Sequence, residues 1–172
     1  LTKMIGKPIL WNNENQMTGD VMHLIGNNKT QKLDSLKVLN NAFIIQKDSL
    51  SKNGYNQIKG QNLYGKFIDS KLKEVDVVKN AEVIYYMYND ANEFIGINKT
   101  VCSKINLELE ENKINSITFF TKTDSHIYPE ADFPENARKL RGFLWRGDER
   151  ILSKDDIFPA EEIALDDKIQ IE

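Results

Sequence analysis

Alternation of apolar and polar residues is the strongest signal in the sequence and predicts β-strands. Residues 105–110 read Ile-Asn-Leu-Glu-Leu-Glu, and a period of two places the three apolar residues on one face of a sheet. We therefore expect both leucines to face the interior and both glutamates to face solvent. A two-residue turn at 111–112 leads into residues 113–120, an apolar run rich in Ile, Thr and Phe, which predicts an antiparallel hairpin.

Two similar hairpins are predicted upstream. They comprise residues 63–68 with 71–78 around a turn at 69–70, and residues 21–25 with 32–38 around a looser loop at 26–28. Each pairs two strands that are adjacent in sequence, so the sequence predicts an all-β protein built from antiparallel strands.

The three hairpins share a pattern with a period of about 40 residues. Lys32-Leu33, Leu36 and Val38 recur 39 positions later as Lys71-Leu72, Val75 and Val77, and 42 positions after that as Lys113-Ile114, Ile117 and Phe119. The first two copies also share an Asn-Ala pair, at 41–42 and 80–81. Such a repeat predicts stacked β layers, each burying its apolar face against the next. Chance similarity between alternating strands is the competing interpretation, and three copies favour the repeat.

The sequence changes character at Pro129. Residues 1–128 contain 16 Lys and no Arg, whereas residues 129–172 contain all four Arg. We predict a repeat β domain over 1–128 and a C-terminal extension over 129–172. In the extension, the order Pro, acid, base and Gly predicts one or two helical turns at 134–140, followed by an apolar anchor at 143–145 and an acidic tail at 153–172.

Composition and motifs argue against catalysis and against nucleic-acid binding. The formal net charge of −3 gives no general attraction to phosphate backbones. The two histidines, His23 and His126, lie far apart in sequence, and the single cysteine, Cys102, is expected to be a buried thiol, so we predict no metal site. Without a phosphate loop or nucleophile motif, we predict no enzyme and no cofactor.

The hydropathy of the chain and its first residue bear on its cellular location. No run of about 18 apolar residues occurs, so no membrane-spanning helix is predicted. The chain begins with Leu1 rather than Met, and we expect a preceding segment, for which a removed signal peptide is one explanation.

Alternation and repeat phase together select a set of interior residues. These candidates for an apolar groove are Leu36, Val38, Leu63, Phe67, Val75, Val77, Val83, Tyr85, Ile105, Leu107, Leu109, Ile117 and Phe119. Ordinary core packing is the competing interpretation for most of them.

Short motifs, in this order and spacing, resemble a known family. They are Asn40-Asn41-Ala42-Phe43-Ile44-Ile45, Asn56-Gln57-Ile58-Lys59-Gly60, Asn98-Lys99-Thr100, Ile127-Tyr128-Pro129 and Gly142-Phe143-Leu144-Trp145-Arg146. The chain up to about Ile157 resembles the OstA-like proteins of Bacteroidetes, relatives of LptA and of the amino-terminal domain of LptD in lipopolysaccharide transport. Nothing in it resembles the outer-membrane barrel of the larger LptD proteins.

The resemblance implies a fold, a location and partners. The fold would be a β-jellyroll, or β-taco, of antiparallel strands bent into an open V, located in the periplasm. Its interior would shield the acyl chains of lipopolysaccharide or another lipid, and its edge strands would pair with LptA- or LptD-type modules or with a second copy. The extension after Pro129 lies outside the repeat and is a candidate cap against such chain growth.

Two alternatives stay open at this point. The first is a structural domain whose interior is filled by its own side chains and which acts only through edge pairing. The second is a carbohydrate-binding or hydrolytic β domain that uses Tyr85, Tyr86, Tyr88 and Trp145 as sugar platforms. Aromatic residues clustered in one strand more commonly serve core and cross-strand packing.

Overall fold

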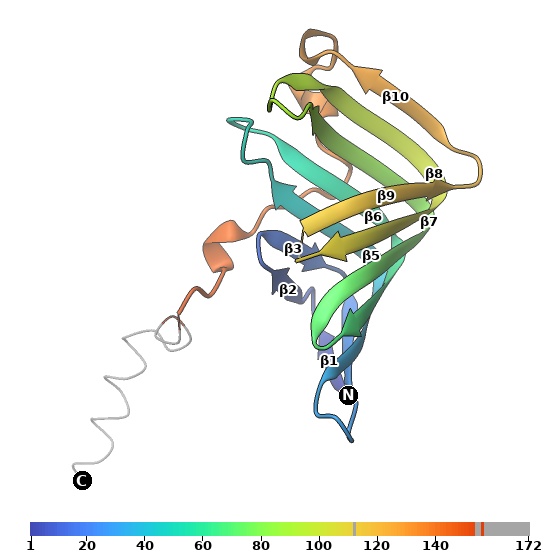
Figure 1. Ribbon diagram of the computed structural model, residues 1–172, viewed down its shortest axis with the longest axis vertical. Helices are drawn as coiled ribbons and strands as arrows, with labels where there is room; N and C mark the ends of the chain where they lie inside the picture. The colour runs from blue at the N-terminus through green and yellow to red at the C-terminus, as the bar shows by residue number, and fades with distance from the viewer. Residues whose placement is uncertain (112, 154–155, 157–172) are drawn as a thin grey trace, which may run out of the picture.

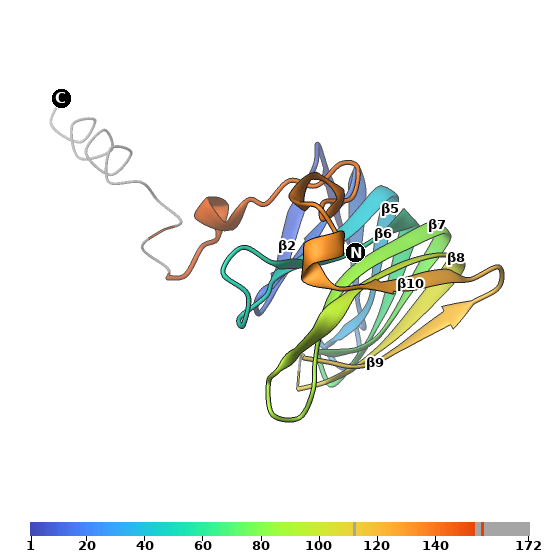
Figure 2. The same cartoon turned by 90° about the horizontal axis from the view of Figure 1, so that it is seen from above.

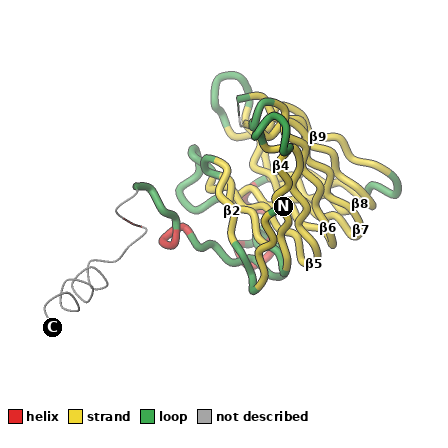
Figure 3. Tube along the Cα trace, turned by 90° about the horizontal axis from the view of Figure 1, so that it is seen from below, coloured by secondary structure: helices red, strands yellow, loops and turns green. Residues whose placement is uncertain are grey.

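The protein is one antiparallel sheet that carries a C-terminal segment on one face. A computed structural model describes residues 1–111, 113–153 and 156 (Figures 1 and 3). Its strands are β1 (Thr2–Ile5), β2 (Ile9–Asn12), β3 (Asn15–Thr18), β4 (Val21–Gly26), β5 (Leu33–Lys47), β6 (Tyr55–Ile68), β7 (Lys71–Tyr88), β8 (Phe94–Glu110), β9 (Lys113–Phe120) and β10 (Asp124–Tyr128). The predicted hairpins are all present, with Ile68 opposite Lys71 and Glu110 opposite Lys113. The all-β antiparallel prediction is confirmed.

Bends in the long strands divide the sheet into two leaves. The first leaf has the order β1-β4-β5-β6-β7-β8-β9 and the second has the order β2-β3-β5-β6-β7-β8-β10, so four strands run through both. Pairs of residues with positive φ mark the bends at Asn40-Asn41, Lys79-Asn80 and Thr121-Lys122. These pairs occupy equivalent positions of the 39- and 42-residue repeat. Figure 2 shows β9 and β10 meeting at their shared bend and diverging from it.

Equivalent repeat positions lie in rows across the first leaf. The register aligns Val38, Leu63, Val77, Ile105 and Phe119 in one row, and Leu36, Gly65, Val75, Leu107 and Ile117 in the next. Leu107 is 1% exposed and Leu109 is 6% exposed, whereas Glu108 and Glu110 are exposed. The predicted inward and outward faces of this strand are therefore confirmed.

Small residues beside the bends let the two leaves approach each other. Ala42 is paired with Gly60, and Ala81 is paired with Cys102, on the inner face of the second leaf. A Cβ atom added to Gly60 would lie 2.6 Å from Cγ1 of Val77. Side chains of the first leaf thus occupy the space that larger residues at the bends would need.

Gly60→Ala is expected to destabilise the protein. The added methyl group overlaps Val77, and such overpacking costs about 1–3 kcal/mol. Gly26→Ala is the matched control, because its added Cβ would meet only the Lys32 carbonyl oxygen, at 3.5 Å. Urea unfolding of both variants checks the prediction, and equal midpoints would show that the leaves are not in close contact at Gly60.

Two apolar clusters lie on opposite faces of the sheet. The inner cluster fills the space between the leaves. The outer cluster covers the outer face of the second leaf, where Phe43, Ile45, Ile84, Tyr86 and Ile97 are buried by Phe133 and Leu140. The residues that cover this cluster belong to the C-terminal strap, residues 129–150, which runs in Figure 1 from β10 toward β3 and β2.

The strap contains three short 3-10 turns, Glu130–Asp132, Glu135–Ala137 and Gly147–Glu149. The middle turn confirms the helical turn predicted within 134–140. Of the predicted apolar anchor, Phe143 and Trp145 pack against the outer cluster, but Leu144 is 63% exposed because it points away from the sheet. The predicted acidic tail falls on residues 154–155 and 157–172, which lie outside the described residues, and on the described residues 153 and 156.

Two fully buried glutamines hold the strap through its backbone. Gln57 Nε2 donates to the Arg138 carbonyl oxygen at 2.7 Å, and the Leu140 N–H donates to Gln57 Oε1 at 2.8 Å. Gln16 repeats this arrangement with Leu144 and Arg146, at 2.8 and 2.7 Å. Each glutamine therefore binds the carbonyl of one strap residue and the N–H of the residue two positions later.

Candidate functional site

The thirteen predicted interior residues all lie in the inner cluster. Nine are buried: Leu36, Val38, Leu63, Val75, Val77, Val83, Ile105, Leu107 and Leu109. Four are partly buried and packed against them: Phe67, Tyr85, Ile117 and Phe119. The structure thus brings the whole set together between the leaves, and contact of these residues with a lipid stays a prediction.

The space between the leaves is filled in its middle and open at the β9 and β10 end. A cavity of about 520 Å³ lies at this end. Its lining includes Tyr85 and Met87 of β7, Asn98 of β8, Ile117 and Phe119 of β9, Ile127 of β10, and Leu50 of the β5–β6 loop. Only three of the thirteen predicted residues line it, because the others are covered by the opposite leaf.

Several residues that line this cavity are not among the thirteen predicted from the sequence. Met87 follows Tyr85 by two positions on the same face, so extending the alternation to the end of β7 would have found it. Ile127 lies beyond the bend at Thr121-Lys122, in a strand whose residues are otherwise polar or aromatic. Leu50 lies in a loop, where no alternation of apolar and polar residues could have indicated that it lines a cavity.

The inner face of the four long strands carries no charged side chain. In β5, β6, β7 and β8, alternation places most Lys, Asp and Glu side chains on the outer face. The remaining ones lie at a bend or in a bulge, where the register is interrupted. On the outer face these charges form ion pairs, such as Lys104 with Asp76 at 2.9 Å and Lys59 with Glu82 at 3.0 Å. Burial raises the pKa of the Tyr85 phenol, which keeps that inward-facing group neutral.

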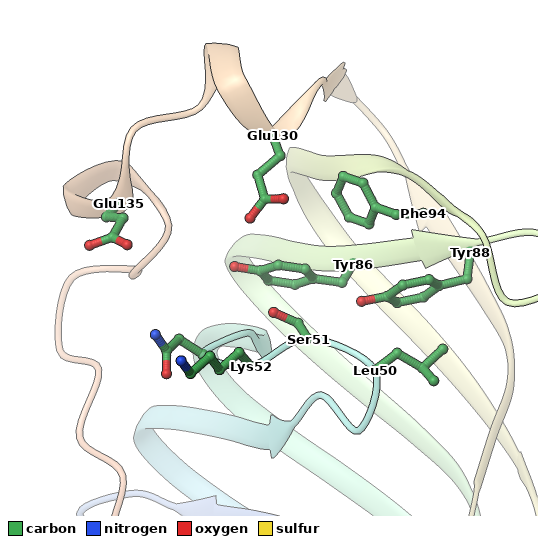
Figure 4. A pocket seen from close by; sticks show the side chains of 9 residues that line it. Leu50, Ser51, Lys52, Tyr86, Tyr88, Phe94, Glu130 and Glu135 are labelled. Carbon is green, nitrogen blue, oxygen red and sulfur yellow. The ribbon is translucent and has the colours of Figure 1, made fainter.

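A second pocket of about 320 Å³ lies on the outer side, between the β5–β6 loop, β7 and the strap (Figure 4). The rings of Tyr86, Tyr88 and Phe94 line it, and the Glu130 carboxylate is paired with Arg138 at 2.9 Å. The Tyr88 hydroxyl donates to the buried Asp48 carboxylate, and burial together with this contact raises the pKa of Tyr88.

The four aromatic residues of the carbohydrate alternative do not share one surface. Tyr85 packs against the inner cluster and Tyr86 and Tyr88 pack in the outer cluster, although all three contribute to the lining of the open cavity. Trp145 of the strap packs against Tyr55 at 5.5 Å and against Trp11 at 5.4 Å between ring centroids. Trp145 does not contribute to the cavity lining that the three tyrosines share, so the four residues do not form one platform.

Groups that could support other chemistry are dispersed. Cys102 is buried, its thiol donates to the Lys104 carbonyl oxygen, and burial raises the pKa of the thiol. Among residues 1–111, 113–153 and 156, no three His, Cys, Asp or Glu side chains gather where a metal ion could bind. No helix in the same part of the chain has the length and apolar character needed to cross a membrane.

No family model and no curated protein matches this sequence. Among solved structures, the chain is similar to LptH, the LptA homologous periplasmic component of the conserved lipopolysaccharide transport device from Pseudomonas aeruginosa. The two chains are 15% identical, with a TM-score of 0.50 over 74% of this chain and 83% of that chain. This likeness confirms the predicted LptA-like β-jellyroll fold.

Proposed function

We propose that this protein is a non-enzymatic, periplasmic lipid-binding module of lipopolysaccharide transport. The observation that carries the proposal is the uncharged, apolar space between the leaves, which opens as a cavity at the β9 and β10 end. The fold shared with LptH supports a role in the same transport process. A narrower relationship, to the OstA-like proteins of Bacteroidetes and to the LptD amino-terminal domain, is part of the proposal.

Apolar burial would drive binding. Each methylene removed from water contributes about 0.8 kcal/mol, so ten buried methylenes contribute roughly 8 kcal/mol before the cost of ordering the chain. The middle of the interior is already filled, with Val77 and Ile105 at most 1% exposed. The acyl chain would therefore lie at the open end, against Ile117, Phe119 and Tyr85.

Ile117→Trp is expected to weaken binding of a fluorescent fatty-acyl probe about tenfold or more, because the indole fills space that the acyl chain would occupy. The fold should tolerate the change, since Ile117 lies on an edge strand beside the cavity. Thr118→Trp is the matched control, because Thr118 is exposed and points outward from the same strand. Probe titration and thermal melting are measured on both variants.

A second candidate is a structural domain that acts through its edge strands. The near-complete burial of nine of the thirteen predicted residues favours it, because much of the interior is filled by the protein itself. β1 and β9 end the first leaf and could pair with modules of the same type or with a second copy. Wild-type protein that binds neither lipid A nor a fatty-acyl probe would leave this candidate as the better account.

A further inference from the structure

Uncharged hydrogen-bonding side chains form a row across the inner face of the second leaf. The register pairs Asn12 with Asn15, Asn15 with Gln46, and Gln46 with Asn56. The β6–β7 register, with Gln57 opposite Ile84, places Asn56 opposite Tyr85, which is paired in turn with Asn98. We name these six residues the inner polar row: Asn12, Asn15, Gln46, Asn56, Tyr85 and Asn98.

The inner polar row lies parallel to an apolar row. Two positions closer to the bends, the inner face carries Met17, Ile44, Ile58 and Val83. Because neighbouring strands lie about 4.8 Å apart, the inner polar row offers a donor or acceptor at about that interval. Tyr85 and Asn98 place one end of this row in the lining of the open cavity. A lipid seated there would meet apolar residues along its chain and neutral polar groups farther from the bends.

Part of the inner polar row is left without partners. Asn15 is 3% exposed, yet among the residues that the structure describes its Oδ1 has no hydrogen-bond donor, and the buried Asn12 Nδ2 has no acceptor. Buried polar atoms are normally paired, because an unpaired one loses its hydration without compensation. Other members are held in place by the protein, since Asn56 Oδ1 accepts from the Tyr86 N–H and Asn98 Nδ2 donates to Ser125 Oγ.

We infer that the bound lipid carries a neutral linkage of amide, ester or hydroxyl groups at the head of its acyl chain, and that the inner polar row binds this linkage. The inference rests on the proposed function. Amide side chains both donate and accept, which matches such a linkage. A carboxylate or phosphate would need a cationic partner, and the inner face of the four long strands provides none, so charged groups stay outside the leaves.

Competition against a fluorescent fatty-acyl probe tests the inference. The competitors are monomyristoyl glycerol and myristate at pH 8, which share one chain length and differ in carrying a neutral ester or a charged carboxylate. We expect the glycerol ester to bind about tenfold or more tightly than myristate, the difference expected for one buried, unpaired group.

Two variants test whether the inner polar row causes the preference for the ester over the carboxylate. Tyr85→Phe removes only the hydroxyl at the cavity, and Gln46→Leu removes an amide from the middle of the inner polar row, so each should reduce the preference for the ester several-fold. Tyr64→Phe is the control, because Tyr64 is 41% exposed on the outer face of the first leaf. Equal affinities for both lipids, or a preference that both variants retain, would overturn the inference while the proposed function stands. Failure of every acyl probe to bind would overturn the proposed function itself.

Discussion

Leu107→Asp is expected to unfold the protein or to lower its free energy of unfolding by about 4 kcal/mol or more. Leu107 is 1% exposed at the centre of the inner cluster, between Val75 of β7 and Ile117 of β9. An aspartate there would bury a charge among apolar side chains with no cation nearby on the inner face. Thermal melting followed by circular dichroism measures the loss.

Glu108→Lys is the matched control for this change. Glu108 lies one position away on the same strand, is exposed, and accepts a hydrogen bond from Ser116 Oγ at 3.1 Å. Substitutions at such exposed positions usually alter the free energy of unfolding by no more than about 0.5 kcal/mol. Similar losses in the two variants would contradict the assignment of β8 faces.

Gln57→Leu is expected to release the strap and to cost about 3 kcal/mol of stability, because two buried backbone groups lose their partners at once. These groups are the Arg138 carbonyl and the Leu140 N–H. Leucine is similar in size and apolar, so the outer cluster keeps its volume while the strap loses its attachment. Limited trypsin digestion should then cut after Arg138, Lys139 and Arg141 many times faster than in the wild type.

Gln61→Leu provides the control for the strap experiment, because Gln61 is exposed beside the bends and, unlike Gln57, forms no hydrogen bond with the described strap residues 129–150. It should digest at the wild-type rate. Unchanged cleavage in Gln57→Leu would mean that the remaining contacts hold the strap, namely the Gln16 hydrogen bonds and the apolar contacts of Phe133, Leu140 and Trp145.

The strands and their faces could be predicted because a period of two is a local property. Ile105, Leu107 and Leu109 needed only their own sequence to be placed on one face. The bends could not be predicted, because they do not disturb this period of two. One bend inserts two residues of positive φ between Val38 and Ala42, and another inserts two between Val77 and Ala81. Because the number inserted is even, the inward-facing positions before and after each bend keep the same alternation. The third bend also has no Asn, since Thr121 and Lys122 adopt the positive φ angles there.

The open cavity and the strap attachment depend on contacts that sequence does not display. The strand segments beyond the bends, such as 43–45 and 83–86, are apolar on both faces, which is typical of strands covered on both sides. The sequence predicted an apolar anchor at 143–145, but nothing in it identified the face of the sheet that residues 133–146 cover. Gln16 and Gln57 look like ordinary exposed residues, and only the fold reveals that they are buried and bound to a distant backbone.

The strap also sets the order in which the chain can fold. Strands of the sheet pair mostly with sequence neighbours, so the hairpins close short loops at small entropic cost. The hydrogen bonds of Gln57 instead join residues 81 and 83 positions apart, and those of Gln16 join residues 128 and 130 positions apart. The strap therefore makes contacts of much larger sequence separation than the hairpins do, and we expect it to dock after the sheet has formed. Until the strap closes, the outer cluster is an uncovered apolar surface, and during this interval the folding chain would be most exposed to aggregation.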